Sequence, residues 1–523
     1  MASEFFDVKP IPRQLKDQVQ IYFEEQLYTL ALSLLTNVLG SGASSEQCQL
    51  VPRFIPPPQY LGLICNLIVH PRTTSRAGTL EARHAATMAQ TYLENVLHMV
   101  GSVGGRLNEA FQFRSQNNRR RRANITYENA SHGSDPEEED PIGGNMANLW
   151  NISPDFWSVV GWAFNCSVRY PVRWECWQPW LHLMIDILRR DWDYYCELPR
   201  DVEGEPQKEI FRKSILLTYL SDKGGRNNNA FKWVKKALFA DGMRGSISIF
   251  QEVFPNETKK VSSQRAKRKH SQTIDDEKNQ FGDYESDDSC DASIKNGATS
   301  SFDTFVEDLS CLQDPDLDED EIGLYIESVP IRLKLISLLS DATFILKTEF
   351  ISPQDFYEDI ARDIRQQPFP IFQAFFNFTA TCLLFPQYVY MIRELFSQLL
   401  PPSHTRPFKI DSQADGAGEI TQKILEQCFL QHSAATVTYQ DNAQLQFICE
   451  QTIIALNSER LIFRTESFVQ IAEKGLQARM RKIKHPRTGR KGLGMSDKVA
   501  KDFLDQAPDR MKLILANISE AGH

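Results

Sequence analysis

Apolar residues recur along most of this chain every three or four positions, the spacing that places them on one face of an α-helix. Glycine or proline follows many of these stretches, as residues that end helices do. The pattern predicts helices over residues 19–39, 60–69, 80–100, 154–164, 179–196, 208–220, 229–239, 246–253, 331–346, 353–365, 372–384, 388–399, 419–431, 442–456, 460–474 and 496–517.

The predicted helix starts are also chemically sensible. Ser153 and Ser352 each precede a proline, so both serines are predicted N-caps with proline at the first helical position. The best strand candidate is the short segment ATVTYQ, residues 435–440, which contains several β-branched residues. The sequence therefore predicts an all-α protein.

Short connections between so many helices indicate stacked helical pairs. We expect irregular stacked hairpins, as in a HEAT- or armadillo-like solenoid, because no fixed repeat period is evident. A multi-helix globular array with long disordered insertions is the alternative. The predicted organisation is an N-terminal helical region (1–114), a flexible charged linker (115–145), a tryptophan-rich helical region (146–255), a disordered basic-then-acidic linker (256–302) and a C-terminal helical region (303–518).

Charge is distributed unevenly. The 523-residue chain has a net charge of −10. Residues 275–321 contain 17 acidic residues and two lysines, a local net of −15, so the remainder carries about +5. The acidity therefore belongs to one segment and not to the predicted helices.

Seven of the eight tryptophans lie within the 43 residues from Trp150 to Trp192. On a helix beginning near residue 179, an apolar stripe with helical spacing predicts a buried core face. Its members are Leu181, Met184, Leu188 and Trp192, and Trp174 and Trp177 continue it if the preceding turn is helical. Trp174 and Trp180 fit the stripe less well. With Arg173, they are candidate exposed anchors for a partner, because tryptophan and arginine are enriched in binding hot spots.

Sequence signatures of catalysis are missing. The chain contains no phosphate-binding loop, dinucleotide-binding glycine pattern, nucleophile elbow or zinc-protease motif. The ten cysteines are scattered, with no pair at zinc-ligand spacing. We expect reduced thiols, no enzyme activity, no cofactor and no bound metal.

One basic run resembles a bipartite nuclear-import signal, and its polar surroundings would let an import receptor bind it in extended form. The run comprises Lys259, Lys260, Arg265, Lys267, Arg268 and Lys269. A generic charged linker is the alternative interpretation. We predict a nuclear protein, and otherwise a cytoplasmic one, because no secretory signal or membrane-length apolar run is present.

Residues 474–491 carry eight lysines and arginines and no acid. Such a segment can neutralise nucleic-acid phosphates, although it can also be a solvated surface or a docking site for the chain's own acidic segment. The candidate phosphate contacts are Arg479, Arg481, Lys482, Lys484, Arg487, Arg490 and Lys491. Candidate phosphorylation sites in the charged linker are Ser271, Ser286 and Ser289.

Together these patterns predict a nuclear helical scaffold or adaptor that binds protein partners in an assembly associated with chromatin or nucleic acid. The alternative is a subunit that contacts nucleic acid directly through residues 474–491. Protein partners, an import receptor and nucleic acid are the expected binding partners, and no membrane is expected.

Overall fold

The computed structural model describes residues 7–41, 52–113, 148–198, 211–221, 228–259, 317–346, 350–483 and 495–520. The chain divides into two compact units. Residues 1–257 and 317–523 form one unit, called the helical body below, and residues 258–316 form the other. Every element described below belongs to the helical body.

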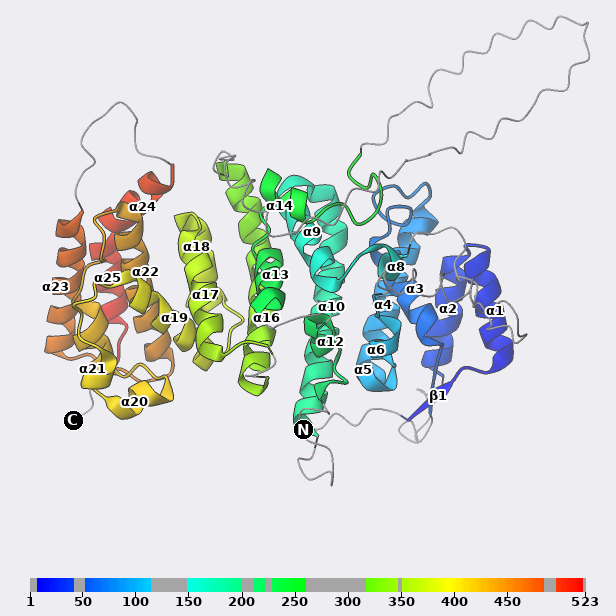
Figure 1. The fold of residues 1–523 in the computed structure, drawn as a ribbon, viewed down its shortest axis with the longest axis horizontal. Helices are drawn as coiled ribbons and strands as arrows, with labels where there is room; N and C mark the ends of the chain where they lie inside the picture. Colours follow the sequence, from blue (N-terminus) through cyan, green and yellow to red (C-terminus); the bar gives the residue numbers. More distant parts are fainter. Residues whose placement is uncertain are drawn as a thin grey trace, which may run out of the picture. The chain divides into compact units, whose positions relative to one another are not determined.

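Helices dominate the described residues, so the prediction of an all-α protein is confirmed (Figure 1). The first part of the body contains α1 (Arg13–Glu24), α2 (Tyr28–Leu39), α3 (Pro58–Val69), α4 (Leu80–Met99), α5 (Gly101–Gly104), α6 (Leu107–Ala110), α8 (Leu149–Ile152), α9 (Phe156–Arg169), α10 (Pro171–Glu197), α12 (Ile215–Ser221), α13 (Asn228–Leu238) and α14 (Arg244–Ile249). The second part contains α16 (Glu319–Ile345), α17 (Pro353–Gln366), α18 (Phe369–Phe376), η4 (Phe378–Ala380), α19 (Phe385–Leu399), η5 (Pro407–Lys409), α20 (Ser412–Ala417), α21 (Gln422–Ile424), the π-helix η6 (Leu425–Leu430), α22 (Tyr439–Ser458), α23 (Glu466–Lys482), α24 (Met495–Asp505) and α25 (Ala507–Ala516).

Helices pack mainly on helices that are close to them in sequence. α1 packs on α2, and α4 packs on both α2 and α3. α10 contacts α3, α4, α5 and α9, while α9 also contacts α13 and α16. Beyond α16 the contacts pass through α18 to α22, and α24 and α25 pack on α22. The core therefore continues from one group of helices to the next along the helical body.

Two short strands, β1 (Val8–Pro10) and β2 (Arg53–Ile55), form a parallel pair that the sequence did not predict. The strand candidate at residues 435–440 does not form a strand. Thr438 caps the start of α22 by accepting a hydrogen bond from the backbone N–H of Asp441, and Tyr439 is already helical. The β-branched threonine serves here as a helix cap, a role for which its hydroxyl is well suited.

The single helix predicted over residues 19–39 is broken in two. Gln26 has a φ angle of 58°, a left-handed conformation that a continuing α-helix cannot contain. The chain reverses there, so that α2 packs back on α1. The turn brings Phe23 and Tyr28 together in the core, with ring centroids 6.4 Å apart.

Two long helices begin earlier than predicted. The prediction took a proline as the mark of each helix start, whereas that proline lies inside the helix. α10 and α16 are each 27 residues long and contain Pro179 and Pro330, respectively. The sequence pattern placed helix starts at or just after these prolines. An internal proline costs a helix about 3 kcal/mol, but the turns before it bury large side chains, including Trp174, Trp177 and Tyr325. This packing offsets the lost backbone hydrogen bond.

Of the two predicted N-caps, Ser352 is confirmed and Ser153 is wrong. Ser352 accepts a hydrogen bond from the backbone N–H of Asp355, 3.1 Å away, and Pro353 is the first residue of α17. At the other position the cap is Asp155, not Ser153, because Asp155 accepts a hydrogen bond from the N–H of Ser158. α9 therefore begins two residues later than the serine predicts.

Candidate functional site

The tryptophan-rich region forms a core. Trp150, Trp157, Trp162, Trp174, Trp177, Trp180 and Trp192 are all buried. The prediction that Trp174 and Trp180 are exposed anchors is wrong, because only 5% and 0% of their surfaces are exposed. The predicted stripe of Leu181, Met184, Leu188 and Trp192 is buried as expected. Trp180 is enclosed despite lying off that stripe, because α10 is covered on several sides by α3, α4, α9 and α16.

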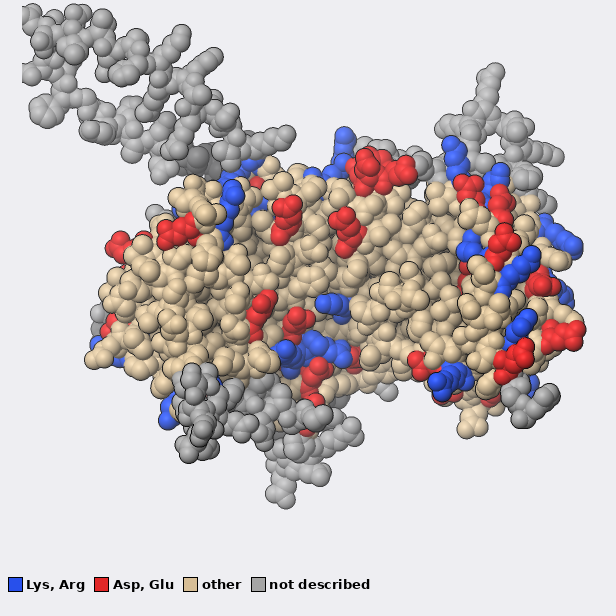
Figure 2. Space-filling view, turned by 180° about the vertical axis from the view of Figure 1, so that it is seen from behind, with Lys and Arg blue, Asp and Glu red and all other residues tan. Residues whose placement is uncertain are grey.

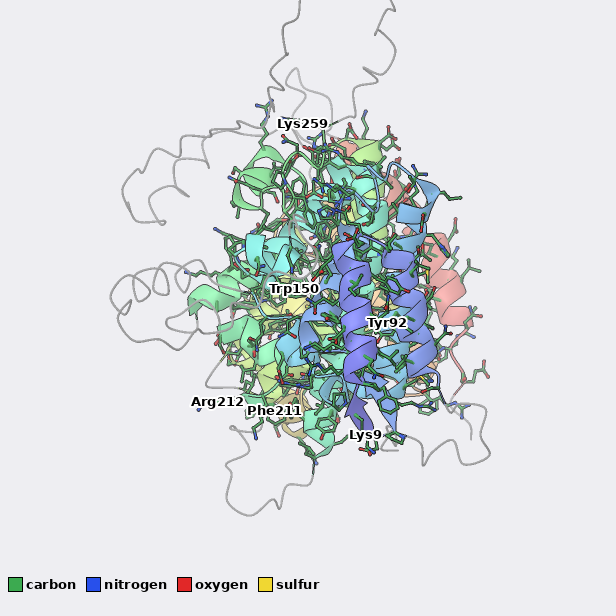
Figure 3. All side chains as sticks on the ribbon, turned by 90° about the vertical axis from the view of Figure 1, so that its right-hand side faces the viewer. Lys9, Tyr92, Trp150, Phe211, Arg212 and Lys259 are labelled. Carbon is green, nitrogen blue, oxygen red and sulfur yellow. The ribbon has the colours of Figure 1, made fainter. Side chains whose placement is uncertain are left out.

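The tryptophans join elements that are distant in sequence. Trp150 donates its indole N–H to the carbonyl of Gly62, 2.9 Å away, and Trp157 donates to the carbonyl of Tyr219 at 3.1 Å. Trp177 and Trp180 form an edge-to-face pair with centroids 5.5 Å apart. Such pairs favour a fixed geometry beyond what burial alone provides. Figure 3 labels Trp150 on the ribbon of this region.

Arg173 is also buried, at 2% exposure, so the prediction of an exposed arginine beside the tryptophans is wrong. Its guanidinium lies 2.5 Å from the Glu257 carboxylate. It also donates to the Val69 carbonyl at 2.8 Å and to the hydroxyls of Thr74 and Ser75 at 3.0 and 3.3 Å. Burial raises the pKa of Glu257, and the arginine opposes that rise. Arg173 therefore ties α10 to the α3–α4 loop and to the chain after α14.

Arg332 in α16 is a second enclosed arginine, at 0% exposure. It donates to the carbonyl of Ala240, 2.8 Å away, and to the carbonyl of Leu238. Its guanidinium lies 4.0 Å from the ring centroid of Phe164 and 4.1 Å from that of Tyr325, distances typical of cation–π contacts. Burial lowers the pKa of Arg332, and nearby Tyr325 and Asp241 oppose this.

Arg479 lies inside the C-terminal helices and not on the predicted cationic surface. Its exposure is 0%. It donates to the carbonyls of Leu430 and His432 at 3.0 and 2.8 Å and to the side-chain oxygen of Gln446 at 2.7 Å. The prediction that Arg479 is a phosphate contact is therefore wrong, because its guanidinium is enclosed and bound to carbonyls at and just after the end of η6.

Gly475, one turn before Arg479, allows this close approach. A Cβ atom added to Gly475 would lie 1.8 Å from the carbonyl oxygen of Leu430, so only glycine fits. Burial lowers the pKa of Arg479, and Cys449 and Glu450 oppose the shift. The π-helix η6 and α23 thus form one packed unit, in which Arg479 satisfies the carbonyl of Leu430 at the end of η6 and that of His432 just after it.

The remaining predicted site residues are exposed or lie outside the described residues. Arg481 is exposed and Lys482 is half-buried at the end of α23. Lys259, labelled in Figure 3, is exposed. Residues outside the described ranges are Lys260, Arg265, Lys267, Arg268, Lys269, Ser271, Ser286, Ser289, Lys484, Arg487, Arg490 and Lys491.

Two buried titratable groups were missed from the sequence. Burial raises the pKa of Asp191 to about 6, although its carboxylate accepts hydrogen bonds from the backbone N–H of Ile215, 2.8 Å away, and from Ser102. Burial lowers the pKa of His70 to about 4, and the charges of Arg72 and Arg173 lower it further. Asp191 lies three residues after Leu188 and four before Tyr195, on a buried face of α10, so helical spacing was the signal that could have identified it.

A groove of about 770 Å³ lies beside β1, bounded by the start of α3 and the α5–α6 turn. One wall is rich in proline, and Lys9, Arg106 and Glu109 line its rim. Arg106 adopts a left-handed backbone conformation, with φ 51°. Its Nε donates to Glu109 at 2.9 Å. The lining of this groove therefore combines proline side chains with charged ones.

Other surface features are mixed in charge. On the face shown in Figure 2, basic and acidic side chains are interspersed. Among the described residues, no group of three or more His, Cys, Asp or Glu side chains is placed to hold a metal ion. No helix within the described ranges has the length and apolar character needed to cross a bilayer.

No protein-family model matches the chain, and no curated protein matches its sequence.

Proposed function

We propose that the protein is a nuclear helical scaffold or adaptor that binds protein partners in an assembly associated with chromatin or nucleic acid. The observation that carries the proposal is the continuous packing of helices on their sequence neighbours. Stacks of helices offer extended surfaces to other proteins. The proline-walled groove beside β1 adds a concave contact surface for a partner segment.

The buried arginines support the same proposal. Arg173, Arg332 and Arg479 use their donors on carbonyls, hydroxyls and carboxylates of neighbouring elements. Their role is to hold the helices in fixed positions, which a binding surface made from several helices requires. The HEAT- or armadillo-like arrangement and the nuclear location are parts of the proposal that rest on the sequence patterns.

Affinity purification of the tagged full-length protein, with mass spectrometry of the bound proteins, tests the scaffold function. We expect a reproducible set of nuclear proteins. Substituting Lys9 and Glu109 at the groove rim by alanine should reduce one or more of them, while the exposed Arg83→Ala in α4 serves as a matched control. A partner set identical to that of an unrelated helical protein would contradict the proposal.

Fluorescence microscopy tests the nuclear location. Alanine substitution of Lys267, Arg268 and Lys269 should move the protein to the cytoplasm, because an import receptor recognises such a run by its charge. Glutamine substitution of Lys278 and Lys295, two lysines in the acidic half of the same segment, is the control. An unchanged nuclear signal after removal of the basic run would reject it as the import signal.

Direct nucleic-acid binding through residues 474–491 is the second candidate function. It is favoured by the exposed Arg481 and half-buried Lys482 at the end of α23. Anisotropy titrations at low and moderate salt should show salt-sensitive binding, which charge reversal of Arg481 and Lys482 weakens. Arg479 is left unchanged in this test because its loss would perturb the fold. Equal binding by the wild type and the reversed variant would exclude this segment as the contact.

A further inference from the structure

In sequence, residues 258–316 interrupt the helical body. The α9–α10 corner, residues 169–173, contacts the body on both sides of this interruption. Arg173 is paired with Glu257, the last residue of the body before the interruption. Arg169 lies 2.5 Å from Glu321, a few residues after the body resumes at Leu317. Two arginines four positions apart therefore fix both ends of the segment 258–316.

The first end is fixed by a buried carboxylate. Oε1 of Glu257 accepts hydrogen bonds from the backbone N–H groups of Val253 and Phe254, at 3.1 and 3.3 Å. Its Oε2 faces Arg173, and 0% of the Glu257 side chain is exposed. The Phe254 ring lies in the core, 5.0 Å from the ring of His70. Arg173 and two backbone N–H groups therefore satisfy the Glu257 carboxylate at this edge of the body.

The second end is fixed by a helix cap. Asp318 and Glu321 form a capping box, in which each side chain accepts the other residue's backbone N–H, at 2.8 and 3.2 Å. The other oxygen of the Glu321 carboxylate reaches Arg169. A capping box satisfies the free donors at a helix start, so Asp318 and Glu321 themselves cap the start of α16.

Contacts within the body also join the parts before and after the interruption. Arg332 in α16 bonds to carbonyls that follow α13. Arg189 in α10 lies 2.5 Å from Asp341 in α16, and Lys235 in α13 lies 3.4 and 3.3 Å from Asp359 and Asp363 in α17. α9 packs along α16 as well. These interactions are made wholly by residues 1–257 and 317–523.

We infer that residues 260–316 are an insertion that the helical body does not need for folding or cohesion. Insertions are tolerated where burial and hydrogen bonding are complete on both sides of the insertion point. The charged segment and the helical surfaces then act as separate functional parts. Import through the basic run and partner binding by the helices can be lost one at a time; this consequence rests on the proposed function, whereas the folding inference does not.

Cleavage of the full-length protein gives the direct test. A recognition site for a sequence-specific protease is placed between residues 275 and 300, and the cut protein is passed over a gel-filtration column in native buffer. We expect both fragments to elute together at the position of the uncut protein. A second variant carries the same site between α19 and α20, within the body, as the control. Separation of the fragments after cleavage in the 275–300 region would overturn the inference.

Deletion of the segment extends the test. Residues 260–316 are replaced by a Gly/Ser linker of about 12 residues, which spans roughly 20 Å. The melting temperature and the helical circular dichroism of the body should be unchanged. A fall of more than about 5 °C, or loss of helical signal, would overturn the inference.

The same deletion variant separates the inference from the proposed function. In cells it should keep its protein partners and lose nuclear accumulation. If the wild-type protein is not nuclear, the proposed location fails, while gel filtration and melting still decide whether the segment is an insertion. Loss of all partners from a variant that melts normally would contradict the separation of functions.

Discussion

Arg173 in α10 and Arg479 in α23 are both enclosed, but different chemistry surrounds them. Arg173 directly faces a buried carboxylate, and all three of its nitrogens have acceptors. Arg479 meets two backbone carbonyls and the amide of Gln446, and its NH2 has no acceptor within the described part of the chain. The first site is a neutral ion pair, whereas the second holds a cation on peptide dipoles.

A buried arginine therefore links helices in two different ways in this protein. An ion pair is costly to break from one side, because the other charge stays buried without a partner. Removing Arg479 leaves neutral hydrogen-bond acceptors unsatisfied, while the nearby Glu450 carboxylate keeps its own partner, Arg510, at 3.1 Å. The α9–α10 corner should therefore be the more sensitive of the two regions.

Trp180→Ala is expected to have the largest effect, because it empties a fully enclosed site in the α10 core. We expect a loss of about 4 kcal/mol in the free energy of unfolding, measured by chemical denaturation. Leu80→Ala, at a residue 83% exposed in α4, is the control and should change little. A Trp180 variant of near wild-type stability would show that the ring serves another purpose than packing.

Arg173→Met should cost about 3–4 kcal/mol, because it leaves the Glu257 carboxylate buried and unpaired. Adding Glu257→Gln to the same chain should restore part of the loss. Denaturation of the two single variants and the double variant measures the coupling. Independent, additive effects would mean that the pair does not act as a unit, and the contrast with Arg479 would fail.

Arg479→Met should cost about 2–3 kcal/mol, since the carbonyls of Leu430 and His432 lose a donor. Arg481→Met, two residues further along α23 and exposed, is the matched control and should be nearly neutral. Thermal melting of both variants makes the comparison. Equal effects at the two positions would contradict the burial of Arg479.

Asp191 lies in α10, and Asp191→Asn should remove a pH-dependent contribution of about 2–3 kcal/mol to the free energy of unfolding. The pKa of Asp191 is raised to about 6 in the folded protein, against about 4 in an unfolded chain. The folded state therefore binds the proton more tightly, and stability falls as the pH rises from about 4 to 6. The asparagine variant cannot ionise, so its stability relative to the wild type should increase over this interval.

Unfolding free energies of the two proteins at pH 4, 5, 6 and 7 measure this effect. A constant difference between them across the series would show that Asp191 does not titrate in this range. His70 acts in the opposite direction, because its lowered pKa causes stability to fall as the pH decreases from about 6.5 to 4. The measurement is therefore made as a difference between variants and not on the wild type alone.

Local patterns were sufficient to predict much of the helical structure. Apolar spacing located α3, α4, α13 and α17 closely, and Ser352 with Pro353 marked a helix start correctly. The errors occur where tertiary packing changes a local preference. Pro179 and Pro330, which the pattern placed at or just before helix starts, lie inside α10 and α16. Gln26, in a left-handed conformation, divides one predicted helix.

The candidate site residues were harder to predict because burial depends on partners far along the chain. The carboxylate that meets Arg173 is 84 residues away, and the carbonyl that meets Arg479 is 49 residues away. No spacing rule connects such groups. A run of lysines and arginines looks uniformly solvated in sequence, although one member of it is enclosed.

The local sequence pattern is enough to predict that the protein is helical, where its charge is concentrated and which residues form the stripe of α10. These properties depend on interactions within a few turns, so periodicity and capping reveal them. The inward positions of Trp180, Arg173 and Arg479 depend instead on how the helices pack. Their positions result from contacts among several helices, where enclosing an aromatic ring or satisfying a carbonyl outweighs the local preference of the side chain for solvent.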